Sequence, residues 1–370
     1  MRFEILQENL KKSLSYLQKI VPNKAQLNAL SSILIELKGN QLELAGTDLY
    51  LGIKTNLTVK GEGEGRVSIE AETFRSLINS LEAGMIIVER DGGSLVISQG
   101  KTRAKISLKN DEEFPEFPEV IGETILLEAE DLVQINELVS FAASSDQTRP
   151  VLTATLLNFK QDSLEVVATD GFRLGRLSLS TGLTAGALAG ILLPTKALVE
   201  LHRILKQSEE KEVKMIYSLE MKQLLFEFAH LKMYVRLVDG DYPPFEKIIP
   251  NSFELRVEFD AQELLTQLRR ALVFSKGISS VATLEVSEQE LIVSAKSVEA
   301  GEYTGSLPVL NPSSATGKIA FNIAYLVDFI NALKPETVVF QMNESLKPAM
   351  FADKNRDNYF YIVMPFRVSE

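Results

Sequence analysis

Hydrophobic and polar residues follow a pattern that repeats three times along the chain, at domain-sized intervals. Each copy opens with a short apolar strand and continues into a helix whose apolar residues, spaced three or four apart, form one buried face. A period of about 20 to 50 residues would indicate a solenoid, so this longer period indicates repeated domains. The opening helices carry Leu10, Leu14 and Leu17; Leu132, Ile135 and Leu138; and Leu264, Leu268 and Leu272.

A tight hairpin and a second amphipathic helix complete each copy. Alternating apolar residues after the first hairpin turn, at Leu49, Leu51 and Ile53, predict a half-buried strand. The hairpins lie at residues 42–48, 164–171 and 291–296. The second helices carry Phe74, Leu77 and Leu81; Leu198, Leu201 and Leu205; and Leu326, Phe329 and Leu333.

The order of these elements predicts an α+β fold with antiparallel sheets on one side and two helices per domain on the other. Turn-forming residues cluster at 114–118 and 239–244, where one copy gives way to the next. We therefore expect three domains, at residues 1–122, 123–248 and 249–370. Because both linkers are short, neighbouring domains should pack rigidly.

Composition narrows the class of protein. Hydrophobic residues make up 45% and charged residues 24%, which excludes a disordered chain and a membrane protein. Charged residues at the start, Arg2, Glu4 and Glu8, argue against a signal peptide. The absence of cysteine excludes disulfides and thiolate chemistry and favours the cytoplasm. With a net charge of −11, any nucleic-acid binding requires a segregated positive surface.

Patterns that would indicate catalysis or metal binding are weak. The glycine-rich segment 61–65 lacks the Lys and Ser/Thr that close a phosphate-binding loop. The two histidines, His202 and His230, have no ligand-type spacing to support a zinc site. Asp48 and Asp170 could act in acid–base chemistry, but each follows a threonine in a repeated turn, so a turn-forming role is favoured. We expect no catalytic residue, no metal and no cofactor.

Basic residues gather on the predicted helices, whereas much of the acid lies in segments such as 111–119 and 209–212. For one helix, a solvated face is the ordinary interpretation. Recurrence across three domains favours a shared positive surface. The residues are Lys11, Lys12, Lys19, Lys196, Arg203, Lys206, Arg269 and Arg270.

Five short strings together resemble, in order and spacing, the beta subunit of bacterial DNA polymerase III, the sliding clamp family. They occupy residues 46–49, 148–152, 168–174, 237–243 and 364–368, so the resemblance covers the whole chain. It implies the DNA clamp fold, in which two three-domain chains join head to tail as a closed homodimeric ring. The helices would line the hole and the sheets would form the outer wall.

By this resemblance the protein is a processivity factor and a non-catalytic accessory subunit of the polymerase III holoenzyme. It would encircle double-stranded DNA without reading its sequence, and the closed ring would hold the replicative polymerase at high effective concentration. Its other partners would be the clamp loader and the repair and translesion polymerases, bound through short linear peptides.

The resemblance also implies a peptide pocket between the second and third domains. An apolar pocket with a few polar anchors suits a peptide ending in Leu and Phe. Phe172 stands where many relatives have His, and Lys247 where some have Arg, so a shifted peptide preference is expected. Ser369 and Glu370 extend past the usual end, toward the pocket mouth. The pocket residues are Leu152, Thr169, Gly171, Phe172, Arg173, Leu174, Pro243, Lys247, Ile248, Pro348, Ile362, Val363, Met364, Pro365, Phe366 and Arg367.

Two further sets of residues follow from the resemblance. Glu72 and Thr73 occupy a place that is often basic in relatives, which should thin the positive lining in the first domain. The DNA-facing residues are Lys24, Arg149, Lys196, Arg203 and Lys206. At the subunit joint, apolar contacts would anchor the pair and charges would set its orientation. Here Phe74, Ile78, Arg103 and Lys105 would face Val273, Phe274, Glu299 and Glu302.

Two other functions compete with a clamp. One is a protein-interaction scaffold that uses the same peptide pocket without encircling DNA. The other is an aspartate-dependent hydrolase built on Asp48 and Asp170, which the repetition of the turn disfavours.

Overall fold

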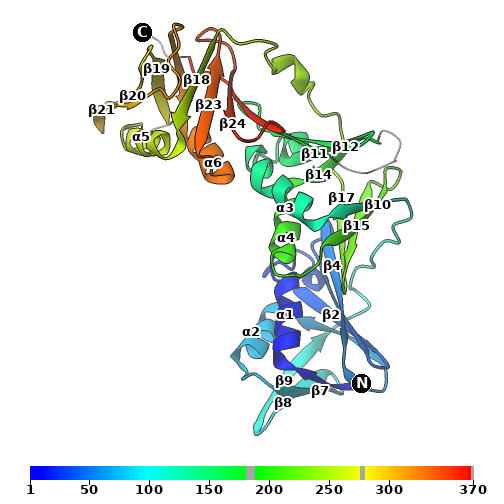
Figure 1. The fold of residues 1–370 in the computed structure, drawn as a ribbon. Coiled ribbons are helices and arrows are strands. Elements are labelled where there is room, and N and C mark those ends of the chain that lie inside the picture. Colours follow the sequence, from blue (N-terminus) through cyan, green and yellow to red (C-terminus); the bar gives the residue numbers. More distant parts are fainter. Residues whose placement is uncertain (181–187, 276–279, 368–370) are drawn as a thin grey trace. The chain divides into compact units, whose positions relative to one another are not determined.

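A computed structural model describes residues 1–180, 188–275 and 280–367 (Figure 1). The chain forms two compact units, one made of Met1–Glu130 with Glu200–Leu237 and the other of Asp131–Val199 with Val238–Glu370. The α-helices are α1 (Gln7–Leu17), α2 (Ala71–Ser80), α3 (Ala129–Leu138), α4 (Thr195–Leu205), α5 (Ala261–Phe274) and α6 (Ile323–Leu333). Four 3₁₀ turns lie at Asn28–Ser31, Ser140–Ala142, Pro150–Thr153 and Phe245–Ile248.

One antiparallel sheet of 13 strands runs through the first unit, in the order β10-β15-β16-β17-β4-β3-β2-β6-β9-β8-β7-β1-β5. Strand β17 pairs with β4 in the register Val235↔Leu51, which joins the first sequence copy to the end of the second. The strands are β1 (Arg2–Leu6), β2 (Ser32–Lys38), β3 (Gln41–Thr47), β4 (Leu51–Thr58), β5 (Lys60–Glu62), β6 (Gly65–Glu70), β7 (Met85–Asp91), β8 (Ser94–Gln99), β9 (Thr102–Lys109), β10 (Glu123–Glu128), β15 (Glu212–Ser218), β16 (Gln223–Phe228) and β17 (Leu231–Arg236).

The second unit holds an eight-stranded sheet, β14-β11-β12-β13-β25-β24-β23-β18, and a four-stranded sheet, β21-β20-β19-β22. Pairing of β13 with β25 joins the second copy to the third, as β4 and β17 join the first to the second. The strands are β11 (Ala154–Lys160), β12 (Ser163–Thr169), β13 (Arg173–Ser180), β14 (Leu188–Pro194), β18 (Leu255–Asp260), β19 (Val281–Val286), β20 (Glu290–Ser297), β21 (Gly301–Pro308), β22 (Gly317–Asn322), β23 (Thr337–Met342), β24 (Ala349–Asp353) and β25 (Tyr359–Val363).

The three-copy α+β pattern predicted from the sequence is confirmed. Each copy opens with a strand and a helix, as β1-α1, β10-α3 and β18-α5, and carries a second helix, as α2, α4 and α6. Two boundaries between the compact units fall inside helices of the second copy. One lies after Glu130 in α3 and the other after Val199 in α4.

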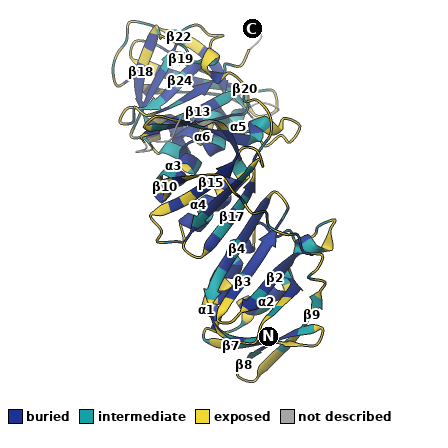
Figure 2. Cartoon of the chain, turned by 90° about the vertical axis from the view of Figure 1, so that its right-hand side faces the viewer, coloured by how far each residue is buried: buried dark blue, intermediate teal, exposed yellow. Residues whose placement is uncertain are grey.

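The apolar stripe of each helix packs inward. Leu10, Leu14 and Leu17 of α1 are at most 1% exposed, as the three-and-four spacing predicts (Figure 2). Side chains at three helix starts accept hydrogen bonds from free backbone N–H groups. Glu70 accepts from Glu72 and Thr73, Asp260 from Glu263, and Asn322 from Ala324. Within the described residues, the helices are too short or too polar to cross a bilayer.

Aromatic side chains form the core beneath α6 in the second unit. The ring of Phe329 stacks on those of Tyr361, at 5.3 Å, and Tyr359, at 6.4 Å, both from β25. The hydroxyl of Tyr361 also donates to the carbonyl oxygen of Tyr325 on the helix. These contacts hold β25 against α6.

Candidate peptide-binding site

A sharp turn between β12 and β13 presents the most exposed aromatic residue of the predicted pocket. The hydroxyl of Thr169 donates to the carbonyl oxygen of Arg173 at 2.6 Å and accepts from the N–H of Gly171 at 3.0 Å. One carboxylate oxygen of Asp170 accepts from the N–H groups of Phe172 and Arg173. Gly171 has a φ of +93°, a conformation that glycine adopts without strain. The turn leaves Phe172 56% exposed, and Asp170 serves to form it.

An apolar cluster lies beside this turn. Its centre includes Leu174 and Ile362, which face each other across the β13–β25 pair and are both 0% exposed. Partly buried hydrophobic residues surround this centre, so part of the cluster reaches the surface. They are Val151, Val238, Tyr242, Ile248, Ile249, Met350 and Phe360.

Arg173 is held within the structure on several sides. Its guanidinium bonds the carboxylates of Asp170, at 3.0 Å, and Asp328 of α6, at 2.6 Å. It also lies over the rings of Tyr325, at 4.5 Å, and Phe141, at 5.8 Å. The side chain is 12% exposed, so it positions the turn more than it offers a surface to a ligand.

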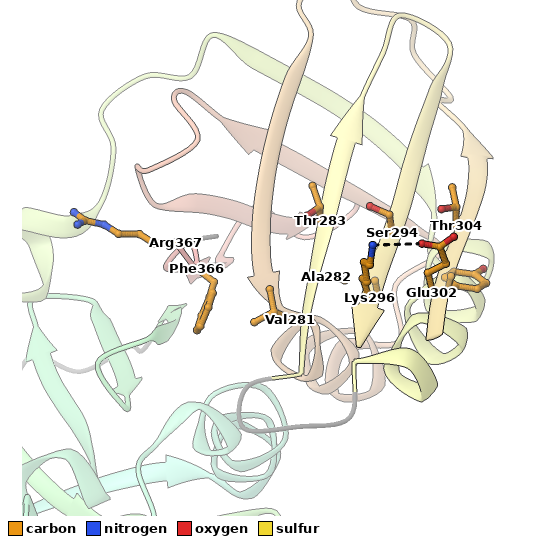
Figure 3. A pocket seen from close by; sticks show the side chains of 11 residues that line it. Val281, Ala282, Thr283, Ser294, Lys296, Glu302, Thr304, Phe366 and Arg367 are labelled. Atoms are coloured by element: carbon orange, nitrogen blue, oxygen red, sulfur yellow. Dashed lines mark ion pairs between the residues drawn. The ribbon is translucent and has the colours of Figure 1, made fainter. Parts of the chain in front are cut away.

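The segment after β25 contacts first the β12–β13 turn and then strand β22. The N–H of Met364 donates to the carbonyl oxygen of Phe172 at 2.8 Å, and that of Phe366 donates to Ala320 of β22 at 2.7 Å. Phe366 and Arg367 line a different hollow of about 450 Å³, on the face of β19, β20 and β21 (Figure 3). The two residues expected in the peptide pocket therefore contribute to this second hollow. Val368, Ser369 and Glu370 lie outside the described residues.

The other predicted pocket residues come from three places. Leu152 is buried in a 3₁₀ turn, Pro243 and Lys247 are exposed in the linker before β18, and Pro348 is half-buried before β24. The sequence prediction missed Val151, Ile249 and Met350, and also Tyr242, whose burial raises the pKa of its hydroxyl. The sequence signals that could have identified such residues are the apolar residues of the 239–244 linker and the alternating apolar positions of β24.

The residues expected to face DNA are mostly exposed. Lys24, Arg149, Lys196 and Lys206 are all exposed; Lys196 lies in the first turn of α4, and Lys206 directly follows the helix. Arg203 is 25% exposed, because it bonds Glu200 at 2.8 Å and the carbonyl oxygen of Tyr16. Among the described side chains, no cluster of three or more His, Asp or Glu is arranged to hold a metal ion.

Two residues expected at the subunit joint lie in the core of the single chain. Phe74 and Ile78 of α2 are both 0% exposed there. Their spacing of four on one amphipathic helix already placed them on its buried face.

The other residues expected at the joint lie on or beside two edge strands and at the end of α5. Strand β9 pairs with β8 along 102–107 but meets β6 only at its last two residues, so among the described residues most of its other edge has no strand partner. Arg103 and Lys105 are exposed there. Strand β21 ends the four-stranded sheet, and Glu302 lies on it. Val273 is 52% exposed at the end of α5.

Known proteins of one family match this chain over its whole length. Models of the DNA polymerase III beta subunit match its N-terminal domain at residues 1–118, its central domain at 126–244 and its C-terminal domain at 246–367. The beta sliding clamp of Chlamydia muridarum is 26% identical over 100% of both chains. The crystal structure of the DNA polymerase III subunit beta from Pseudomonas aeruginosa, also 26% identical, superposes with a TM-score of 0.94 and covers 100% of both chains. A sliding clamp from the same organism bound to griselimycin has the same identity, coverage and TM-score.

Proposed function

The chain belongs to the family of DNA polymerase III beta subunits, and on that premise we propose how its residues serve a sliding clamp. It is a processivity factor and not an enzyme: it encircles duplex DNA, tethers the replicative polymerase and recruits other proteins to the DNA. A closed ring stays on DNA by topology, so it needs only weak phosphate contacts that carry no sequence information. Tethering keeps the polymerase at high effective concentration near the primer end.

Three domains at 1–122, 123–248 and 249–370 form the repeating unit of this clamp. The family matches to 1–118, 126–244 and 246–367 support these boundaries. Each boundary falls in a linker between a final strand and the next opening strand, as at 110–122 between β9 and β10.

The subunit joint forms where the edge of β9 in one chain pairs with the edge of β21 in its partner. Both edges offer free backbone groups, and joining them extends one sheet across the joint. Arg103 and Lys105 on β9 complement Glu299 and Glu302 beside or on β21, which sets the orientation. Val273 and Phe274 supply the apolar contact, and Phe74 and Ile78 support it only from the core. The resulting head-to-tail contact closes as a two-chain ring.

The DNA surface comprises Lys24, Arg149, Lys196, Arg203 and Lys206. Their support is exposure on helices or loops in a protein whose net charge is −11. Long cationic side chains can reach the phosphates without reading bases. Arg203 acts mainly by holding α4 to α1, because its guanidinium is already bonded to Glu200 and Tyr16.

Partner proteins bind through short peptides at the cluster around Leu174 and Ile362. Phe172 provides an exposed ring and Lys247 an exposed cation, so the site suits an apolar peptide with an acidic group. The partners are the replicative polymerase, the clamp loader, and repair and translesion polymerases. The protein works in the cytoplasm, where its absence of cysteine is no disadvantage.

Retention on circular DNA tests this function. The protein is loaded on a nicked plasmid by a clamp loader, and the amount that remains bound is measured before and after one double-strand cut. Retention on the circle and loss from the linear form are expected, because a ring slides off free ends. Equal loss from both forms would contradict encirclement and favour a scaffold that uses the peptide site alone.

A further inference from the structure

The first domain contains the same turn as the peptide site. The hydroxyl of Thr47 donates to the carbonyl oxygen of Leu51 at 2.8 Å and accepts from the N–H of Leu49 at 2.9 Å. One carboxylate oxygen of Asp48 accepts from the N–H groups of Tyr50 and Leu51. These four hydrogen bonds match, position for position, those made by Thr169 and Asp170. Tyr50 therefore takes the place of Phe172.

The strand beside each turn is also equivalent. Val235 pairs with Leu51 in the first case, and Val363 pairs with Arg173 in the second. The backbone N–H of the next residue then donates to the carbonyl oxygen of the exposed aromatic residue. Arg236 donates to Tyr50 and Met364 donates to Phe172, each at 2.8 Å. The first unit thus has a structural counterpart of the peptide site, formed from the first domain and the end of the second.

This counterpart is apolar and accessible. It has a hollow of about 70 Å³ lined by residues 47 and 49–52, the linker residues 115–118, Gln223 and Tyr234. Tyr50 is 66% exposed and Leu49 is 50% exposed. Leu49 also has a φ of +75°, whereas the peptide turn has glycine at the matching position. Exposed apolar side chains together with a strained backbone are typical of binding surfaces.

One sequence difference fills part of this site. Gly52 pairs with Tyr234 where Leu174 pairs with Ile362. A Cβ atom at Gly52 would lie 2.5 Å from the ring of Phe117, so this linker residue closes over the glycine. The hollow that remains has room for about one small side chain of a ligand.

Charge separates the two sites further. The linker 111–119 contains Asp111, Glu112, Glu113, Glu116 and Glu119 without a basic residue, and Glu116 lines the hollow. The linker of the peptide site, 239–247, is less acidic, because it has Lys247 beside Asp239, Asp241 and Glu246. Lys54 and Arg236 lie over the rings of Phe117 and Tyr50, at 5.0 and 6.0 Å, so the excess of negative charge comes from the linker. That excess favours a ligand with basic residues beside its apolar anchor.

We propose that Tyr50, Leu49 and the acidic linker form a second docking site, for a basic linear peptide with one apolar anchor residue. The site lies beyond the peptide pocket proposed above and selects partners of the opposite charge. A clamp with two such sites per chain can hold two different partner proteins at once.

Two fluorescent decapeptides test the proposal on the full-length protein by anisotropy. The basic peptide carries a single central Leu flanked by Lys and Arg, and the acidic peptide carries Glu and Asp before a terminal Leu and Phe. For the basic peptide, Tyr50→Ala and Glu116→Lys should each weaken binding about tenfold, as removal of an interface anchor does. Phe172→Ala, the matched variant in the other turn, should leave that binding unchanged.

The acidic peptide should show the reverse dependence, on Phe172 and not on Tyr50. Thermal melts of each variant check that it remains folded. The second site is excluded if the basic peptide does not bind, or if its binding depends on Phe172 alone. Loss of the acidic peptide's binding alone would instead contradict the proposed peptide pocket. The mass of the wild type and of Tyr50→Ala is also measured by sedimentation over a range of protein concentrations. If the substitution abolishes a self-association seen in the wild type, a second copy of the chain occupies the surface and the proposal is overturned.

Discussion

The guanidinium of Arg173 lies 2.6 Å from the carboxylate of Asp328, so an ion pair joins the peptide turn of the second domain to α6 of the third. The same arginine bonds Asp170 within the turn and lies over the ring of Tyr325 on the helix. The position of Phe172 therefore depends on a helix distant in sequence.

Asp328→Asn should loosen this connection without destroying the turn. Because Asp328 is 48% exposed, we expect a loss of only about 1 kcal/mol of unfolding free energy, as for a partly solvated ion pair. The affinity for the acidic-flanked peptide should fall several-fold, since Phe172 is less firmly placed. Chemical denaturation and anisotropy measure the two effects. Asp357→Asn, an exposed change in the same unit, is the control and should alter neither.

Phe172→Ala and Ile362→Ala should separate binding from stability at the peptide site. Phe172 is 56% exposed, so its loss should weaken peptide binding while the melting temperature stays constant. Ile362 is 0% exposed, so its truncation should cost about 2–5 kcal/mol of unfolding free energy. Denaturation curves and peptide titrations of the same samples measure both. Equal stability of the two variants would contradict the assigned burial.

Charge reversal of Lys196 and Lys206 should weaken the equilibrium binding of the unloaded protein to short linear duplex DNA. If each lysine neutralises one phosphate, the slope of log affinity against log salt should fall in magnitude by about 0.9 per lysine. The slope is measured by titrating the duplex with protein over a series of salt concentrations. Lys38→Glu, on β2 and outside the proposed DNA surface, is the control. An unchanged slope would remove these lysines from the DNA surface.

The subunit joint can be tested by exchanging charges. Lys105→Glu alone should weaken the dimer, because the new carboxylate would oppose the glutamates of β21 across the joint. Glu302→Lys in the same chain should recover part of the lost association. Sedimentation equilibrium measures the dimer constant of each variant. Dimers of equal strength in all three proteins would place the joint elsewhere.

Acid should weaken the sheet at Glu165. Burial alone would raise the pKa of Glu165, but hydrogen bonds from Lys160 and Arg176 outweigh it and lower the pKa below 4.5. The folded state therefore favours the carboxylate, and its contribution to stability is present above the unfolded pKa. That contribution is lost as the pH falls through the lower, folded value.

Glu165→Gln should therefore reduce the unfolding free energy near neutral pH and approach the wild type as the pH falls below about 4.3. Denaturation curves at several pH values give the difference. Glu254→Gln, an exposed change outside this network, is the control. A difference that stays constant down to the lowest accessible pH would contradict the lowered pKa.

Local pattern was sufficient for the secondary structure and for the repeated turn. A helix stripe such as Leu10, Leu14 and Leu17 depends on a period of 3.6 residues, which the sequence contains directly. The turns at 47–51 and 169–173 form from contacts within five residues, so the Thr-Asp pair could be interpreted without any tertiary information.

The sequence by itself thus determined three α+β copies, their helices and strands, and the family to which they belong. Only the tertiary structure decided which strands join the copies, that Phe74 is fully buried within the chain, and that Phe366 lines a hollow separate from Leu174. It also placed Phe117 over Gly52, which distinguishes the two turn sites. The reason is physical: periodicity tells that a side chain is buried, whereas its partner depends on contacts between residues far apart in the chain.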